Sequence, residues 1–281
     1  MKHMISLLLC LISVGVVSAQ GTTDNASRVE LNIQYDGNLL SSKNMDKLEQ
    51  MSAHMTEFYS SLGLNESLDV RLLIFKTQDE GYEYMRTLYP KDKTYQKTAS
   101  DEYFKGGIAG VYMPSSKTAA ILSLEHGMDR GLSVIFHEIS HHYTRLLFGK
   151  KNPPVWFTEG LAEHFENMRF SKKKGWISDV SDFDKGKLKT MHMIGELEVE
   201  DLFDLTHIQF KMKLRNEGDM FYAFSHIVVV VLMNNLDHTT FKELTNRLIN
   251  RKTDEKVSEI VGGIYPGGLN AYKRALHEFI L

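Results

Sequence analysis

The hydrophobic periodicity of the chain changes near residue 129, and this change constrains the fold more than any other feature of the sequence. Alternating and short apolar runs predict strands at 29–35, 70–75, 106–114 and 118–124 and helices at 44–62 and 79–88, with a turn at 115–117. Beyond residue 129 every strong pattern is helical, with helices expected at 129–148, 155–168, 219–235, 239–250 and 269–281. The sequence therefore predicts an α+β fold, with a small mixed β-sheet and helices first and a helical C-terminal part after them.

Residues 1–19 have the pattern of a signal peptide. Lys2 is followed by an apolar run over 4–17, and Ser18-Ala19 supplies small residues for cleavage before Gln20. The run is shorter than the roughly 18–20 apolar residues of a membrane-spanning helix, although an uncleaved anchor is the alternative. The single cysteine, Cys10, lies in this leader, so the mature chain has no disulfide, as expected of a bacterial export product. We expect a secreted or periplasmic protein without stable membrane insertion after cleavage.

The overall charge gives no reason to expect a nucleic-acid partner. The formal net charge is -3 and the isoelectric point is about 6.5, whereas nucleic-acid-binding domains are usually basic. The most basic run, 172–174, has no accompanying pattern of stacking aromatic residues and is interpreted as a solvated loop.

The helix predicted at 129–148 contains the sequence His137-Glu138-Ile139-Ser140-His141. Residues four apart project from the same side of a helix, so both imidazoles can reach one metal ion at about 2.0–2.1 Å. Glu138 is rotated by about 100° from His137, which keeps its carboxylate off the metal but near a metal-bound water, as a general base requires. In a chain with twelve histidines such a pattern also arises by chance, so a third ligand is needed to support it.

Glu159 supplies this third ligand, in Trp-Phe-Thr-Glu-Gly-Leu-Ala-Glu at the start of the next predicted helix. Catalytic zinc sites use three protein ligands and a water, and two histidines with one glutamate is a known set. We therefore expect one Zn²⁺ per chain on His137, His141 and Glu159. Glu163 lies one turn beyond Glu159 and is expected either to accept the second N–H of a ligand histidine or to be an exposed helix residue.

This arrangement of motifs resembles the gluzincin metallopeptidases, the group that includes thermolysin-like proteases and zinc aminopeptidases. His137 to His141 is followed, after seventeen intervening residues, by Glu159 within Trp-Phe-x-Glu-Gly-Leu-Ala-Glu. The chain is most similar to the small bacterial peptidase-MA-like domains, over about residues 106–281. The resemblance implies a zincin-type metal helix and a zinc-dependent peptidase activity.

The resemblance also implies a residue that stabilises the oxyanion. Tyr222, which opens Tyr-Ala-Phe-Ser-His in a hydrophobic helix, stands about where aminopeptidase-like relatives carry such a tyrosine. His226 is the second candidate, because related domains often have an aromatic residue there. Exopeptidase relatives also carry Gly-x-Met-Glu-Asn upstream of the metal helix, whereas this chain has Gly-Gly-Ile-Ala-Gly-Val-Tyr-Met at 106–113. An endopeptidase is therefore expected rather than an aminopeptidase.

Together these features predict an exported bacterial enzyme that hydrolyses a peptide or protein substrate. The strand at 118–124 is the expected edge along which an extended substrate lies. The expected organisation is a signal peptide over 1–19, an α+β part over 20–128 and a helical part over 129–281, which form one catalytic unit. Two alternatives are open: an exported zinc-binding module without turnover, and a zinc amidase acting on cell-wall or modified peptides.

Overall fold

The computed structural model describes residues 31–36, 39–66, 68–88, 108–122, 124, 127–173, 175–193, 198–217 and 220–281. The predicted signal peptide lies outside the described residues. The chain forms two compact units, one of residues 1–53 with 65–132 and the other of residues 54–64 with 133–281. Helices α1 (Ser42–Ser61) and α4 (Met128–Phe148) each contribute residues to both units. The predicted division at residue 128 therefore stays a prediction.

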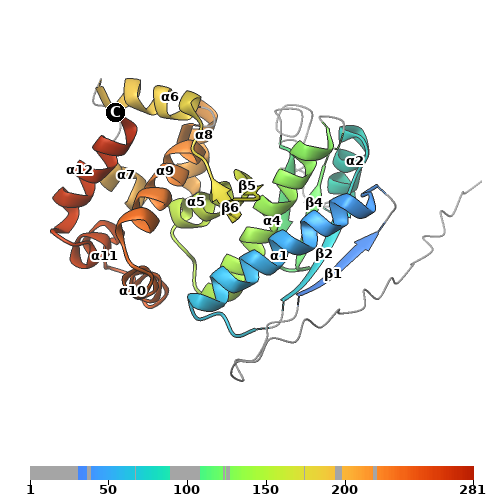
Figure 1. The fold of residues 1–281 in the computed structure, drawn as a ribbon, viewed down its shortest axis with the longest axis horizontal. Coiled ribbons are helices and arrows are strands. Elements are labelled where there is room, and N and C mark those ends of the chain that lie inside the picture. Colours follow the sequence, from blue (N-terminus) through green and yellow to red (C-terminus); the bar gives the residue numbers. More distant parts are fainter. Residues whose placement is uncertain are drawn as a thin grey trace, which may run out of the picture. The chain divides into compact units, whose positions relative to one another are not determined.

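The first unit contains a four-stranded mixed β-sheet (Figure 1). Its strands, in spatial order, are β1 (Leu31–Asp36), β2 (Leu68–Ile74), β4 (Thr118–Ile121) and β3 (Gly110–Met113). The pairs β1–β2 and β2–β4 are parallel, and β3 and β4 form an antiparallel hairpin. This sheet, together with the helices that follow it, confirms the predicted α+β class.

Strand β4 is an interior strand of this sheet. It pairs with β2 on one side and with β3 on the other, and all four of its residues are buried. The prediction that the strand at 118–124 offers a free edge to a substrate is therefore wrong. A continuous apolar run is what a strand buried on both faces requires, whereas strands with one solvated face alternate apolar and polar residues.

Helix α2 (Gln78–Leu88) covers part of this sheet. Tyr82 and Met85 of α2 pack in one buried cluster with residues of the strands. The helix approaches closely at Gly81, where a Cβ atom would lie only 2.5 Å from the carbonyl oxygen of Leu122. A residue without a side chain is therefore required at this position for the helix to rest on the end of β4.

The described residues of the second unit form helices and one hairpin. Its helices after α4 are α5 (Val155–Glu166), α6 (Asp182–Met193), α7 (Val199–Asp204), α8 (His207–Glu217), α9 (Met220–Asn235), α10 (His238–Ile249), α11 (Val257–Ile264) and α12 (Gly268–Ile280). The hairpin joins β5 (Met168–Ser171) to β6 (Gly175–Ser178). The helical character predicted for this part is confirmed, but the hairpin was not predicted, because strands of four residues are too short to show a clear alternation.

Helix α9 forms the centre of the second unit. Its residues 224–232 are all buried, which explains why the helix is apolar on every side. Helix α5 packs directly against it, and Gly160 allows this approach, because a Cβ atom there would lie 2.4 Å from the carbonyl oxygen of Ser225. No helix in the described part of the chain is long and apolar enough to cross a membrane.

Candidate metal centre

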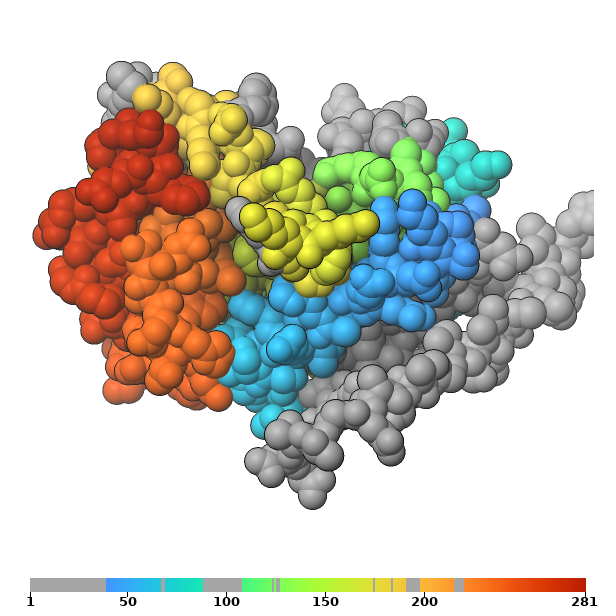
Figure 2. Space-filling view, viewed as in Figure 1, coloured from blue at the N-terminus to red at the C-terminus, as the bar shows by residue number. Residues whose placement is uncertain are grey.

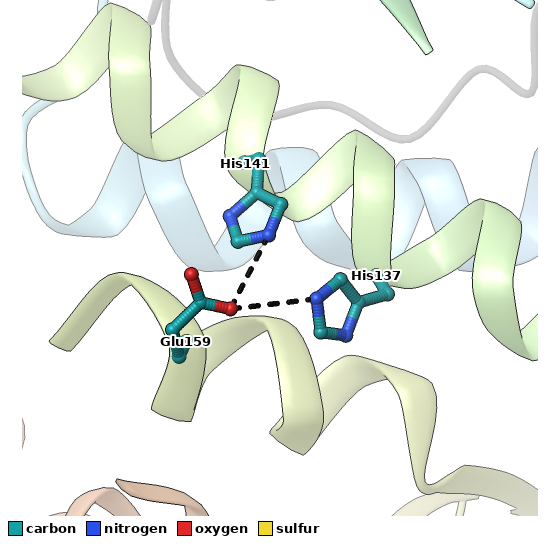
Figure 3. A group of neighbouring side chains, drawn as sticks. All are labelled: His137, His141 and Glu159. Atoms are coloured by element: carbon teal, nitrogen blue, oxygen red, sulfur yellow. Dashed lines mark ion pairs between the residues drawn. The ribbon is translucent and has the colours of Figure 1, made fainter. Parts of the chain in front are cut away.

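Three side chains that can bind a metal converge in the second unit (Figure 3). His137 and His141 lie one turn apart on α4, and Glu159 lies on α5. Oε2 of Glu159 is 3.6 Å from Nε2 of His137 and 3.5 Å from Nε2 of His141. The structure thus brings together the three side chains that the sequence predicts as ligands.

The spacing of these atoms fits a tetrahedral metal ion. Two ligand atoms that each lie about 2.0–2.1 Å from such an ion are about 3.4 Å from one another. Both nitrogen–oxygen separations, 3.6 and 3.5 Å, are close to this value. The side chains are 12–16 % exposed, so the group is shielded but can still be reached from solvent. The three side chains are therefore arranged so that they could hold a metal ion.

Buried contacts within the second unit fix the position of α4. The hydroxyl of Tyr59, near the end of α1, hydrogen-bonds Ser140 Oγ at 2.7 Å and Thr144 Oγ1 at 3.0 Å. The rings of Tyr59 and Tyr143 stack with their centroids 4.8 Å apart, and the Tyr143 hydroxyl hydrogen-bonds Thr56 at 2.6 Å. These buried contacts hold the helix, and with it the direction of the two histidines.

Burial and neighbouring charges act differently on the two histidines. Burial lowers the pKa of His137, but hydrogen bonds to Glu159 and Glu166 raise it, and the net result is a pKa well above its ordinary value. Burial lowers the pKa of His141 to about 4, although the charge of Glu159 opposes this effect. Without a metal, the proton therefore resides on His137, and His141 is neutral. Metal binding must displace that proton, because only a neutral imidazole binds a metal.

Glu166 is the carboxylate that lies closest to the other nitrogen of His137. Its Oε2 atom is 2.7 Å from Nδ1, a hydrogen-bond distance, whereas Oε1 of Glu163 is 3.6 Å away. Glu163 was the residue expected in this place, and Glu166 was not predicted. Both lie on the face of α5 that carries Glu159, four and seven residues further on. The hydrogen bond from Nδ1 leaves Nε2 of His137 directed toward Glu159 (Figure 3).

The remaining predicted residues lie in different surroundings. Glu138 is buried beside His137, and its negative charge contributes to the raised pKa of that histidine. The ring of Tyr222 lies 6.3 Å from the ring of His137, centroid to centroid, and is partly exposed. His226 is buried one turn further along α9, with Nε2 3.2 Å from Ser178 Oγ in β6. Of the two expected oxyanion residues, the structure thus places Tyr222 beside a ligand histidine.

His207 is a further residue near the group that the sequence analysis did not single out. It is the first residue of α8, it is exposed, and its charge lowers the pKa values of both His141 and Glu159. The start of α8 is fixed by a reciprocal pair of hydrogen bonds between Thr206 and Gln209. No spacing in the sequence links His207 to the motif on α4, so only the fold reveals its position.

Neither a protein-family model nor a curated protein matches the chain. The resemblance to gluzincins therefore rests on the motif residues themselves. The structure supports the coarser part of that resemblance, namely a group of two histidines and a glutamate on two helices, consistent with an HExxH-type metal site.

Proposed function

We propose that the chain is a zinc-dependent hydrolase that cleaves peptide bonds within peptide or protein substrates. The observation that carries this proposal is the convergence of His137, His141 and Glu159 at separations suited to tetrahedral coordination. Two imidazoles and one carboxylate are a donor set that zinc accepts. The adjacent carboxylate of Glu138 adds the proton acceptor that a hydrolytic zinc site needs and a purely structural site does not.

Each of these residues has its own role in the proposed hydrolysis. Zinc held by His137, His141 and Glu159 would supply Lewis-acid activation of water and of the substrate carbonyl. Glu138 takes the proton from the attacking water and returns it to the leaving amine. Tyr222 donates a hydrogen bond to the oxygen on which negative charge develops, a contact whose loss typically costs about 10²–10³ in rate. Glu166 keeps the His137 ring in the orientation that binds the metal.

The proposal also includes the cellular location of the protein and the position at which it cleaves a peptide. The leader over 1–19 exports the chain to the periplasm or the exterior of a bacterium, where the enzyme meets its substrates. The chain lacks the Gly-x-Met-Glu-Asn sequence with which related exopeptidases hold a substrate amine. Cleavage is therefore expected inside a peptide rather than at its N-terminus.

The first experiment measures the metal content of the purified chain. We expect about one zinc per chain, in keeping with three protein ligands. The variant Glu159→Ala should lose this zinc, whereas Glu243→Ala, which removes an exposed carboxylate on α10, should keep it. Absence of zinc from the unmodified chain after reconstitution would remove the basis of the proposal.

A second experiment separates metal binding from catalysis. The variant Glu138→Gln should keep its zinc and lose peptide hydrolysis, because the amide cannot accept the proton. Full activity in this variant contradicts the mechanism. Zinc binding without hydrolysis of any peptide identifies a binding module, and cleavage of cell-wall fragments alone identifies an amidase.

A further inference from the structure

The β5–β6 hairpin combines a fixed base with an exposed tip. Trp176 of β6 stacks on His54 with ring centroids 5.9 Å apart, and Ser178 hydrogen-bonds both the His164 carbonyl and the His226 ring. Phe170 is the cross-strand partner of Trp176, and its ring meets the indole edge-on at 5.3 Å. The base of the hairpin is therefore held by buried groups, so its tip can bind a partner with little loss of conformational freedom.

The tip exposes an aromatic ring beside a cluster of positive charges. Phe170 is 59 % exposed, so its ring is accessible at the tip. Lys172 and Lys173 form the turn and are exposed, and the sequence continues with Lys174. Within the described part of the chain no carboxylate forms an ion pair with Lys172 or Lys173, whereas Arg169 pairs with Asp179. Figure 2 shows the hairpin, in yellow, at the surface that faces the viewer.

This local charge is opposite to that of the chain as a whole. The net charge of the protein is -3, yet the stretch 169–179 carries four basic residues and one acidic residue. An anionic surface attracts such a positive segment even though the protein as a whole carries negative charge. The local charge of the hairpin is thus complementary to an anionic partner.

We propose that the β5–β6 hairpin docks the protein reversibly on anionic lipid surfaces, with Lys172 and Lys173 at the headgroups and Phe170 entering the interface. Basic residues next to an aromatic ring are the pattern of peripheral membrane contacts, which lie on a bilayer rather than span it. Nucleic acids fit less well, because their binding sites combine an extended basic groove with several stacking aromatic rings. This surface belongs to the hairpin and does not depend on the metal group.

The test compares binding to phosphatidylcholine vesicles with and without phosphatidylglycerol in a sedimentation assay. The full chain should bind the anionic vesicles, and the double variant Lys172→Glu, Lys173→Glu should bind them at least about tenfold more weakly. The matched control, Lys150→Glu with Lys151→Glu, makes the same charge change at two adjacent exposed lysines between α4 and α5 and should bind like the unmodified chain. Because the leader is common to all variants, its contribution cancels in the comparison.

Tryptophan fluorescence reports whether the hairpin itself touches the lipid. The chain has two tryptophans, and Trp156 is fully buried, so quenching by brominated lipid should come from Trp176 and disappear in Trp176→Phe. Phe170→Ala should weaken binding without changing its salt dependence, because it removes apolar contact but no charge. Equal binding of both double variants, or binding to single-stranded DNA but not to anionic vesicles, would overturn the proposal.

Discussion

Nδ1 of His137 and the carboxylate of Glu166 lie 2.7 Å apart, and this contact determines how His137 presents its other nitrogen. With Nδ1 donating to Glu166, Nε2 is left to face Glu159 at 3.6 Å. A carboxylate in this position fixes the tautomer of the ring and increases its basicity toward a metal. The two carboxylates of α5 thus act on opposite sides of one imidazole.

Replacing Glu166 should therefore weaken metal binding. We expect Glu166→Gln to lower zinc affinity about 10–100-fold, because a neutral amide holds the His137 ring less firmly. Glu163→Gln is the matched control, and its effect should be smaller because Glu163 Oε1 lies 3.6 Å from the same nitrogen. Zinc titration in competition with a chelator measures both affinities. A larger decrease in zinc affinity in Glu163→Gln than in Glu166→Gln would show that Glu163, and not Glu166, orients the His137 ring.

Replacing Tyr222 should affect the rate of hydrolysis, whereas replacing His226 should affect the stability of the fold. Tyr222→Phe should lower kcat about 10²–10³-fold while zinc content and unfolding temperature stay the same, because only the hydroxyl at the reacting oxygen is removed. His226→Ala should instead lower the unfolding temperature, because it leaves a cavity and removes the hydrogen bond to Ser178. Steady-state kinetics with thermal unfolding of each variant separates the two roles. Undiminished turnover in Tyr222→Phe would exclude the tyrosine from the reaction.

Motif spacing predicted the two histidines of the candidate metal group because helix geometry alone places them, whereas Glu159 was predicted because a catalytic zinc site needs a third protein ligand. His137 and His141 are one turn apart in any helix, and the motif containing Glu159 opens the next one. The contact of Glu166 with His137 was not predicted, because it depends on how α5 packs against α4. The packing of two helices cannot be derived from the motif spacing. His207 was missed for the same reason, since α8 brings it close from a distant part of the chain.

The fold was predictable where the elements are long and periodic. The long helices α1 and α4 follow from their apolar spacing and α9 from its nearly continuous apolar stretch. The helices α6, α7, α8 and α11 and the short strands β5 and β6 were not predicted. The start of α8 did carry a signal, because Thr206-His-Ile-Gln209 is a capping box. The interior position of β4 could not be predicted from the sequence, because the order of strands in a sheet depends on pairing with segments far away in the sequence.

The buried histidines His164 and His226 should make stability depend on pH. Burial, with smaller contributions from His226 and His54, lowers the pKa of His164 to about 3, and burial lowers the pKa of His226 to about 4. An unfolded histidine has a pKa of about 6.5, so below this pH the unfolded chain binds protons that the folded chain does not. The stabilising effect of each neutral histidine is complete above pH 6.5 and is lost as the pH falls toward 4. At pH 5 the loss is about 2 kcal/mol for each residue.

Urea unfolding of the metal-free protein between pH 8 and pH 5 tests this dependence. His137, whose pKa is raised, contributes in the opposite direction, so the comparison must be between variants that share it. His164→Leu is suitable, because Nδ1 of His164 has no hydrogen-bond partner among the described residues and little polar contact is lost. When the pH is lowered from 8 to 5, the free energy of unfolding should decrease less in His164→Leu than in the unmodified chain. The difference between the two decreases should be about 2 kcal/mol. If the free energies of unfolding of the two proteins changed equally with pH, His164 would not be held in the neutral form by burial.

Gly160 directly follows Glu159 on α5 and faces α9, so a substitution there should affect both helix packing and metal binding. A Cβ atom there would lie 2.4 Å from the Ser225 carbonyl oxygen and 2.5 Å from Cγ2 of Val229, so Gly160→Ala must push the helices apart. We expect a loss of stability of about 1–3 kcal/mol and weaker zinc binding, because Glu159 moves with the backbone of α5. Gly186→Ala on α6 is the matched control: nothing lies within 4 Å of its Cβ position, and the change should be neutral or stabilising by up to about 1 kcal/mol. Thermal unfolding and zinc titration of the two variants check both effects, and equal behaviour of the two would show that α5 and α9 can separate without disturbing the metal group.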